Sequence, residues 1–208
     1  MNRVAKTYFW SDLHLGSSNL IRFDKRPFNS VDHMHRVLIN NYQSIVAPKS
    51  VCYFIGDIGN KYAVREIIPQ MTNGTKVLIR GNHDKRLSDN FLYSYGFDVI
   101  LYRADITIAK EPVTLTHCPF LGVFREDVTG MNGAKEGDNW HGESWHGLYS
   151  CKDDGQFLLH GHIHSGPHRG DKKTIQDRMW DVGVAANNYR PISISKIESW
   201  ITKYKKGE

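Results

Sequence analysis

Five short blocks of metal-ligating side chains occur in order along the chain. They are Asp12-Leu13-His14, Gly56-Asp57, Gly81-Asn82-His83-Asp84, His117 and Gly161-His162-Ile163-His164. Carboxylate and amide oxygens combined with imidazole nitrogens suit Mn²⁺, Fe, Ni²⁺ or Zn²⁺ better than Mg²⁺ or Ca²⁺, which prefer oxygen alone. An isolated D-x-H is a weak signal, but the ordered set predicts a transition-metal site.

The same ligand set supports two metals. One bridging carboxylate can hold two cations about 3.5 to 4 Å apart, the spacing at which hydrolases polarise a phosphoryl oxygen and generate hydroxide. Asp57 directly follows the apolar run 51–55, so it is placed to be that bridge. A plain turn residue is the alternative, since Asp and Gly are both common in turns.

Short apolar runs rich in aromatic or β-branched residues predict the strands that position these blocks. Each run is followed at once by polar residues. The predicted strands cover residues 6–11, 51–55, 76–79, 113–116 and 157–160, with later ones at 180–182 and 192–195.

Helices are predicted between the first three strands and after the third. Ser30 is a cap candidate for a helix over 31–45, a weaker helix covers 62–68, and a third starts near Ser88. Strands that alternate with helices favour parallel pairing, at least in the amino-terminal half. Because ligands gather beyond the carboxyl ends of such strands, the five blocks are expected to meet there.

Composition indicates an ordinary globular protein. The 208 residues are 40% hydrophobic and 24% charged, which predicts a single domain over 1–208. No apolar run is long enough for a membrane helix or a signal-peptide core, so we expect a cytoplasmic protein without membrane partners. Three scattered cysteines are expected to be reduced, and the net charge of +5 favours anionic partners.

The ordered blocks resemble those of the calcineurin-like metallophosphoesterases, which carry D-x-H, G-D, G-N-H-D/E, a lone H and G-H-x-H in this order. Arg26-Pro27-Phe28 and the G-N-H-D form are similar to small stand-alone enzymes of bacteria and phages. The resemblance implies an α/β fold in which two mixed β-sheets face each other between helices, a four-layer α-β-β-α sandwich.

The resemblance also implies roles for the ligands. One metal takes Asp12, His14, Asp57 and His164, and the other takes Asp57, Asn82, His117 and His162. His83 is implied to donate a hydrogen bond or proton to the ester oxygen, with Asp84 orienting it, so both are predicted catalytic residues. The cofactors are two divalent transition-metal ions, most simply Mn²⁺, with a hydroxide between them as the nucleophile.

The expected substrate is a phosphodiester, nucleotide-like in character. Arg26, Asn82 and His83 are the predicted substrate-binding residues, with Arg80 as a second candidate cation. A monoester needs more positive charge around it than these residues offer. Phe28 and the tryptophans of segment 140–147 are candidates to stack on a base, while that segment is equally well explained as a loop that covers the core.

Other functions remain open at this point. A phosphomonoesterase uses the same motif, and a DNA or RNA nuclease is slightly favoured by the basic charge, although no lysine and arginine stripe is evident. A non-catalytic binding protein of the same fold would usually lack a ligand, and none of the expected ligands is missing.

Overall fold

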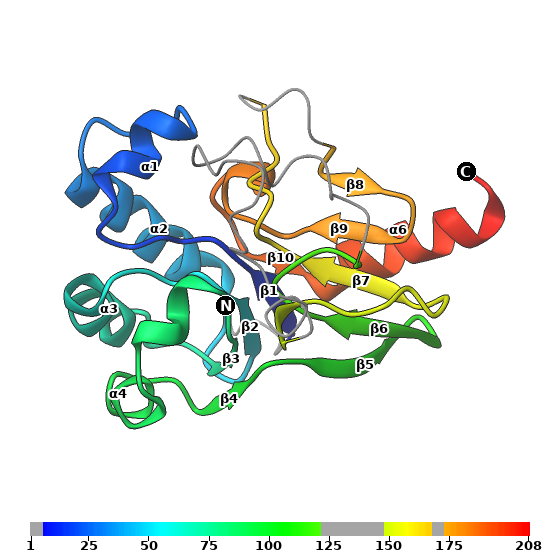
Figure 1. Cartoon of the computed structure of the whole chain (residues 1–208), viewed down its shortest axis with the longest axis horizontal. Helices are drawn as coiled ribbons and strands as arrows, with labels where there is room; N and C mark the ends of the chain where they lie inside the picture. The colour runs from blue at the N-terminus through cyan, green and yellow to red at the C-terminus, as the bar shows by residue number, and fades with distance from the viewer. Residues whose placement is uncertain (1–5, 122–147, 168–172) are drawn as a thin grey trace, which may run out of the picture.

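Two five-stranded sheets lie next to each other, and most helices gather on one side of them (Figure 1). The computed structural model describes residues 6–121, 148–167 and 173–208. The segment 140–147, whose role was left open, lies outside these residues. The mixed α/β class with two mixed sheets is as predicted.

The first sheet carries the parallel strands expected from the amino-terminal half. Its order is β10-β1-β2-β3-β4, with β1 to β4 parallel and β10 antiparallel to β1. Its strands are β1 (Thr7–Trp10), β2 (Val51–Ile55), β3 (Thr75–Ile79), β4 (Val99–Leu101) and β10 (Ile192–Ser193).

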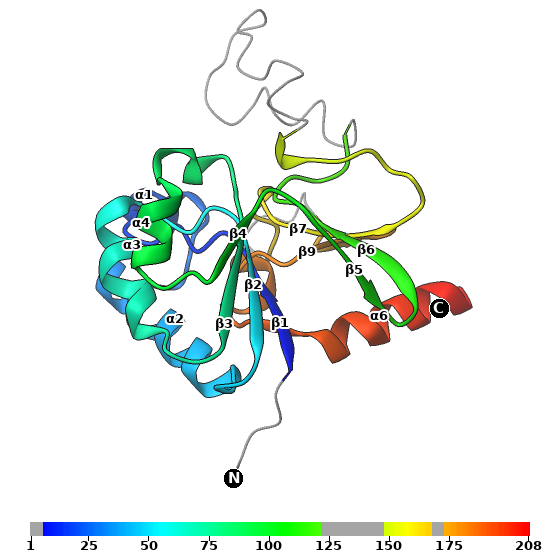
Figure 2. The ribbon, with the colours of Figure 1, turned by 90° about the horizontal axis from the view of Figure 1, so that it is seen from below.

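Four helices cover the face of this sheet that lies away from the second sheet (Figure 2). They are α1 (Ser18–Phe23), α2 (Val31–Ile45), α3 (Lys61–Ile67) and α4 (Asp89–Ser94). The Ser30 side chain accepts a hydrogen bond from the His33 amide and is the predicted N-cap of α2. The Ser88 side chain accepts from the Phe91 amide and caps α4, the helix predicted to start near Ser88.

The second sheet mixes parallel and antiparallel pairs in the order β5-β6-β7-β9-β8. The pairs β6–β7 and β7–β9 are parallel, whereas β5–β6 and β8–β9 are antiparallel. Its strands are β5 (Ala104–Ile108), β6 (Glu111–Leu115), β7 (Phe157–His160), β8 (Ile175–Gln176) and β9 (Met179–Asp181).

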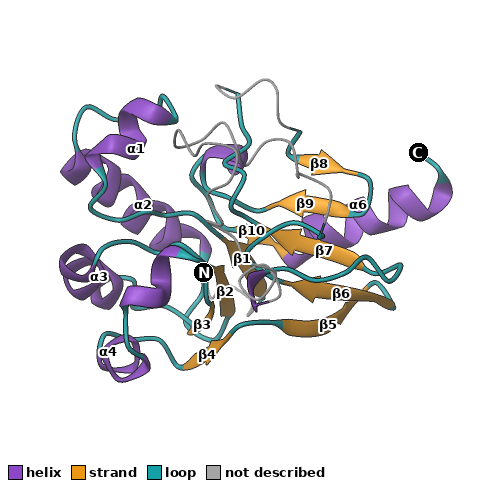
Figure 3. Cartoon of the chain, viewed as in Figure 1, coloured by secondary structure: helices purple, strands orange, loops and turns teal. Residues whose placement is uncertain are grey.

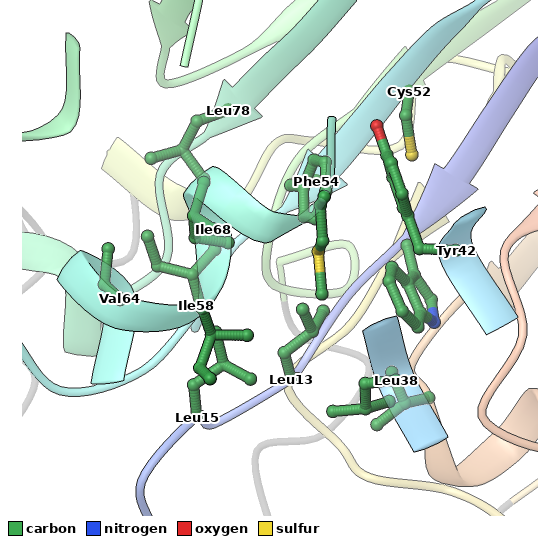
Figure 4. Close-up of a cluster of buried hydrophobic side chains, with 14 of the residues drawn as sticks. Leu13, Leu15, Leu38, Tyr42, Cys52, Phe54, Ile58, Val64, Ile68 and Leu78 are labelled. Carbon is green, nitrogen blue, oxygen red and sulfur yellow. The ribbon is translucent and has the colours of Figure 1, made fainter. Parts of the chain in front are cut away.

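The largest hydrophobic cluster lies between the first sheet and its helices, and it includes residues next to the predicted ligands. Leu13 and Leu15 are fully buried in this cluster together with Ile58, which follows Asp57 (Figure 4). Full burial of a leucine side chain is worth about 1.5 to 3 kcal/mol. The loops after β1 and β2 are therefore anchored in the core.

Helix α6 (Ile194–Lys206) corrects the strand predicted over 192–195, of which only residues 192 and 193 are extended. The helix forms because Ile197 and Ile201, four residues apart, are buried on one face in the cluster between the sheets. Trp200 packs its ring on Phe157 and Trp180, with centroids 5.2 and 5.4 Å apart. Figure 3 shows α6 beside the second sheet, apart from α1 to α4.

The two faces of the second sheet are covered differently within the described residues. Phe157 and Trp180 face the cluster that contains α6, whereas Leu158 and Met179 alternate to the opposite face. There they pack against Phe120 and Cys151, which lie in loop segments. Helix α6 therefore packs on the inner face of this sheet.

In the described part of the chain, no helix is long and apolar enough to cross a membrane.

Candidate metal centre

Residues 12–15, the first ligand turn, continue directly from β1. Asp12 and His14 alternate with Leu13 and Leu15, and both leucines are fully buried in the core. The backbone stays beside the loop after β2, because the amides of Asp12 and His14 donate to the carbonyls of Gly56 and Asp57 at 3.1 and 2.9 Å. The alternation turns the two ligands to one side and the two leucines to the other.

Residues 162–165, the second ligand turn, follow β7 after Gly161. His162 and His164 flank the buried Ile163, so the pattern of ligand, apolar residue and ligand repeats. The amide of His162 donates to both carboxylate oxygens of Asp12 at 3.1 Å. The two turns come from different sheets and meet at this contact.

Backbone strain is concentrated at the predicted ligands. Positive φ angles, uncommon outside glycine, occur at Asp12 (57°), His14 (48°), Asp57 (55°), His162 (70°) and His164 (49°). Such conformations cost of order 1 to 3 kcal/mol each and persist where the surrounding structure enforces them, often at functional sites.

Glycines allow the loops to approach one another this closely. A Cβ atom added to Gly81 would collide with the Asp57 carboxylate, and one added to Gly161 would collide with that of Asp12. The glycines of the G-N-H-D and G-H-x-H blocks are therefore required by the close packing of the ligands.

Asp57 lies at the junction of the ligand set. Its Oδ2 atom is 3.3 Å from His117 Nε2, 3.6 Å from His14 Nε2 and 3.9 Å from His83 Nε2. Its Oδ1 atom accepts the His83 amide at 2.9 Å. One carboxylate oxygen thus faces three imidazoles that come from three different loops.

Asp12 forms a second group with His14 and His164. Asp12 Oδ1 is 3.9 Å from His14 Nε2 and 3.4 Å from His164 Nε2, and these two ring nitrogens are 3.0 Å apart. Potential ligand atoms of Asp12 also group with those of Asp57 and His117. The structure therefore places Asp12 next to both groups, whereas the resemblance implied that Asp57 alone is shared.

His162, one of the two remaining predicted ligands, lies beside His117 of the Asp57 group. The ring centroid of His162 is 5.3 Å from that of His117, with the two rings edge to face. The Asn82 side-chain oxygen is buried. All seven predicted ligands are therefore found in the loops around Asp12 and Asp57.

The pKa shifts show that the carboxylates attract positive charge. Burial would raise the pKa of Asp12 and of Asp57, but His164 and His117 respectively outweigh it and hold both pKa values below the usual one. Burial would likewise lower the pKa of His117, yet the charge of Asp57 raises it to about 10. The same negative charge that favours protonation of the neighbouring imidazoles would also favour a bound divalent cation.

The pKa values of the other three ligand imidazoles are shifted in opposite directions. Burial lowers the pKa of His14 and of His162 to about 3, so these rings are neutral, as metal ligands must be. Burial opposes protonation of His164 as well, but hydrogen bonds to Asp12 and Asp24 raise its pKa to about 9.

Two buried polar atoms provide a test of whether a metal fits. Asn82 Oδ1 and His117 Nε2 have no hydrogen-bond partner among the described residues. His117 Nδ1 lies 2.9 Å from the Ile55 carbonyl, an acceptor only, so Nδ1 carries a proton. Because the pKa of the ring is raised, Nε2 is protonated as well until a metal displaces that proton and takes up the Nε2 lone pair. That lone pair faces Asp57 Oδ2. Because unpaired buried polar atoms are costly, this arrangement fits a cation held between them.

His83 occupies the open side of the centre. It begins a short 3₁₀ helix (His83–Arg86), and 65% of its side chain is exposed. Its ring lies edge-on to that of His14, with centroids 5.3 Å apart. His83 is therefore beside the ligands and accessible to a bound molecule.

Asp84 does not orient His83 as predicted. Its carboxylate is fully buried and accepts the amides of Asp57 and Gly81 on Oδ2, at 2.9 and 2.8 Å, and that of Ile58 on Oδ1 at 3.0 Å. Burial and the neighbouring Asp57 raise its pKa to about 7. Its role is to hold the backbone of two ligand loops in place, because three converging amides need an acceptor.

Arg26 is not available to bind substrate, which corrects a second prediction. Its buried guanidinium donates to the carbonyls of Asp12 and Leu13, both at 3.0 Å, and to Asp24. Arg80 is also buried, and donates to the carbonyls of Asp84 and Leu87 and to the Asp89 carboxylate. Both arginines are used inside the protein because the turns near them leave backbone carbonyls to be paired.

Phe28 is likewise unavailable for stacking on a ligand. Only 8% of it is exposed, and its ring packs edge to face on Tyr189 at 4.7 Å. Trp140 and Trp145 lie outside the described residues.

Two carboxylates that sequence reasoning missed support the centre. Asp24 Oδ2 lies 2.9 Å from His164 Nδ1. Asp181, at the end of β9, accepts the Ser165 amide and hydroxyl and the Gly183 amide. The signal for Asp181 was present, since it ends a strand, much as Asp12 and Asp57 lie just beyond the ends of theirs. Asp24 lies within a connecting segment, where no periodic pattern marks it.

Comparison with known proteins supports the fold and names no activity. No protein-family model matches the chain. An uncharacterized protein of Methanocaldococcus jannaschii is 28% identical over 207 residues, covering 97% of this chain and 94% of the relative. The gene 66 protein of Mycobacterium phage L5 is 27% identical over 182 residues, covering 78% and 79%.

A solved structure has a similar fold. It is a protein of unknown function from Aquifex aeolicus, with a TM-score of 0.63 and 24% sequence identity. The similarity covers 95% of this chain and 100% of the other. The arrangement of sheets and helices is therefore shared by a protein of low sequence similarity.

Proposed function

We propose that this chain is a dinuclear metal-dependent phosphoesterase of the calcineurin-like metallophosphoesterase type, and that it hydrolyses phosphodiesters of nucleotide-like character. The observation that carries the proposal is the position of Asp57 Oδ2, which lies 3.3, 3.6 and 3.9 Å from the Nε2 atoms of His117, His14 and His83. A carboxylate with ligand imidazoles on two sides and an exposed imidazole on a third suits a bridging ligand beside a reaction site.

The donor set divides between two cations. His14 and His164 would hold one cation with Asp12, and His117 and the neighbouring His162 would hold the other with Asp57, to which the resemblance adds Asn82. Manganese, iron, nickel or zinc suits this mixture of nitrogen and oxygen. Two such cations, when bound by these residues, would polarise the phosphoryl oxygens of an ester and would make hydroxide available near neutral pH.

His83 supplies the proton-transfer group in this proposal. Its backbone is fixed because its amide donates to Asp57 Oδ1 at 2.9 Å, while its ring projects from the buried ligands toward solvent. An imidazole held in this way can donate a proton to the departing ester oxygen, which typically contributes about 10² to 10⁴ in rate.

The charge around the centre favours a diester over a monoester. A diester carries one negative charge, whereas a monoester carries nearly two and benefits from an additional arginine clamp. Arg26 and Arg80, the arginines that the sequence offered for this purpose, are both committed to backbone carbonyls and carboxylates. The preference for diesters is therefore stronger than the sequence alone suggested.

The proposal includes the finer features that the resemblance implies. These are one domain over 1–208 and a cytoplasmic location. Of the four-layer α-β-β-α arrangement, the described residues supply the two sheets and the helical layer on the first sheet, with α6 on the inner face of the second sheet. The phosphomonoesterase, nuclease and non-catalytic alternatives are distinguished by the substrates and metals in the assay below.

An assay of the metal-loaded protein tests the function. Purified protein is stripped with chelator, reloaded with Mn²⁺, Fe²⁺, Ni²⁺ or Zn²⁺, and given bis(4-nitrophenyl) phosphate, 4-nitrophenyl phosphate and single-stranded DNA. We expect kcat/KM to be highest for the diester and activity to disappear on chelation. A higher kcat/KM for the monoester indicates a phosphatase, and a preference for DNA that falls steeply with salt indicates a nuclease.

Two variants separate metal binding from proton transfer. Asp57→Asn is expected to lose activity and part of the bound metal, whereas His83→Ala keeps both metals and loses about 10² to 10⁴ in kcat. His33→Ala is the control for removing an imidazole, since this ring packs on Phe28. Near-normal kcat of His83→Ala on an ester with a poor leaving group would show that His83 does not transfer the proton. Metal-loaded protein inactive on every phosphate ester would refute the proposed function.

A further inference from the structure

We infer that Asp24, held by Arg26, is a positioning residue that fixes His164 and ties the two ligand turns together. The inference rests on the proposed metal centre and adds residues that the ligand motif does not contain. Asp24 and Arg26 lie in the connection between α1 and α2, outside both sheets.

Asp24 is directed at His164 by a buried ion pair. Its Oδ2 atom is 2.9 Å from His164 Nδ1 and 3.3 Å from both Nε and Nη2 of Arg26. The side chains of Asp24 and Arg26 are each fully shielded from solvent. The carboxylate is therefore fixed between one imidazole and one guanidinium.

This contact determines which nitrogen of His164 faces the ligands. A carboxylate oxygen accepts, so Nδ1 carries the proton that it donates to Asp24. Nε2 is then directed to the other side of the ring, where it lies 3.4 Å from Asp12 Oδ1 and 3.0 Å from His14 Nε2. Carboxylates behind metal-binding histidines orient the ring and increase its basicity in this manner.

Arg26, the partner of Asp24, also contacts the ligand turn that follows the first sheet. Its Nη2 and Nη1 atoms donate to the carbonyls of Asp12 and Leu13, both at 3.0 Å. The first ligand turn follows β1 of the first sheet and His164 follows β7 of the second sheet. A single pair of side chains therefore contacts ligand loops from both sheets.

The connection that carries the pair is itself held in place. Asp24 is the C-cap of α1, and its amide donates to the Leu20 carbonyl at 2.9 Å. The Arg26 amide donates to the Ile21 carbonyl, also at 2.9 Å. Lys25, between them, has a positive φ of 48°. This bend turns the side chains of Asp24 and Arg26 toward each other and toward the ligand turns.

Asp24 is predicted to affect one of the two metals. His164 belongs with Asp12 and His14, whereas His117 takes its Nδ1 partner from the Ile55 carbonyl and does not contact Asp24 in the described structure. Loss of a supporting carboxylate typically weakens metal affinity about 10- to 100-fold. The weakened site should be the one that contains His164.

Metal titration of stripped, full-length protein tests this inference. Mn²⁺ is added to wild type, Asp24→Ala, Asp24→Asn and the control Asp32→Asn, an exposed carboxylate at the start of α2. Binding is followed by calorimetry, and metal content is measured after dialysis. Asp24→Ala should weaken one of two binding steps about 10- to 100-fold. Asp24→Asn should lie between it and wild type, because its amide oxygen still accepts from Nδ1.

The outcomes distinguish positioning from a general structural role and from failure of the proposed function. Two binding steps in Asp24→Ala that match wild type would overturn the inference and leave the metal centre intact. Equal weakening of both steps, with a lower unfolding midpoint in chelator, would also overturn it. If Asp24→Ala does not fold, Asp24→Asn decides by the same criteria. Wild-type protein that binds no Mn²⁺ would overturn the inference together with the proposed function.

Discussion

The two ligand turns share one local pattern but are held by different means. In each, two ligands with positive φ flank a buried apolar residue, Leu13 in the first turn and Ile163 in the second. The pattern directs both ligands of a turn to the same side. The first turn is stabilised by backbone pairing and the hydrophobic core, whereas the second is stabilised by carboxylates from other elements.

The first ligand turn is stabilised by its own sheet and core. The amides of Asp12, His14 and Leu15 donate in sequence to carbonyls of residues 56, 57 and 58, continuing the pairing of β1 with β2. Leu13 and Leu15 are fully buried in the main hydrophobic cluster. This turn is therefore an extension of regular structure.

The second ligand turn is stabilised mainly by carboxylates from other elements. Asp12 accepts the His162 amide, Asp24 holds the His164 ring, and Asp181 accepts the Ser165 amide at 2.8 Å. Ile163 is buried but belongs to none of the three hydrophobic clusters of the described residues. Long-range charged contacts here replace the ladder and the core that hold the first turn.

Leu13→Ala should have the largest effect on stability. Removing a fully buried leucine from a well-packed cluster costs about 2 to 5 kcal/mol of unfolding free energy, and its neighbours Leu15 and Ile58 leave little room for relaxation. Urea unfolding in the presence of chelator measures the loss without metal. Ile163→Ala is the matched change in the second turn. Its loss of unfolding free energy should be at the low end of this range, about 2 kcal/mol. Equal losses would remove the distinction between the two turns.

Asp181→Asn should have an intermediate effect on stability, at the second ligand turn and at the loop after β9. Both carboxylate oxygens accept hydrogen bonds, from Ser165 and from Gly183, and the asparagine amide group would face one of these donors. A buried donor left unsatisfied costs about 1 to 3 kcal/mol. Asp153→Asn, at an exposed ion pair with Arg178, is the control and should cost less than about 1 kcal/mol. A loss no larger than that of the control would show that Asp181 does not support this turn.

The smallest effect on stability is expected from His35, which accepts the amide of Gly16 directly after the first ligand turn. His35 Nε2 accepts the Gly16 amide at 2.9 Å, and burial lowers the pKa of this histidine. The unfolded chain therefore binds a proton at His35 before the folded chain does, so stability should fall as pH drops below about 6.5. One proton limits the slope to about 1.4 kcal/mol per pH unit.

His35→Gln should flatten that decline, because the glutamine oxygen still accepts the Gly16 amide without titrating. The comparison uses chelated protein unfolded between pH 7.5 and 5. His33→Gln, on the same helix, serves as the control. A pH dependence of unfolding free energy that is the same in His35→Gln and wild type would exclude His35 as its source.

Local sequence pattern was sufficient to predict several elements and the position of the ligands. Apolar runs of five residues or fewer set β2 and β7 at their observed bounds, and the spacing of apolar residues with Ser30 as a cap set α2. The same rule, that polar residues follow buried strands, brought the seven predicted ligands to one place. The strands β4 and β8 were missed because they are too short to carry a pattern, and β5 because polar residues interrupt its apolar ones. Helix α6 was missed because its first residues were assigned to a strand.

Only the tertiary structure decided what the supporting residues do. Arg26 and Asp84 were expected to act on the substrate and on His83, yet each is buried against backbone groups of the ligand loops. Asp24 and Asp181 support the second turn from distant parts of the chain. A buried charge acquires its partner from whichever segment folds against it, and that segment is set by packing across the two sheets. The local sequence around a buried charge therefore does not predict its partner.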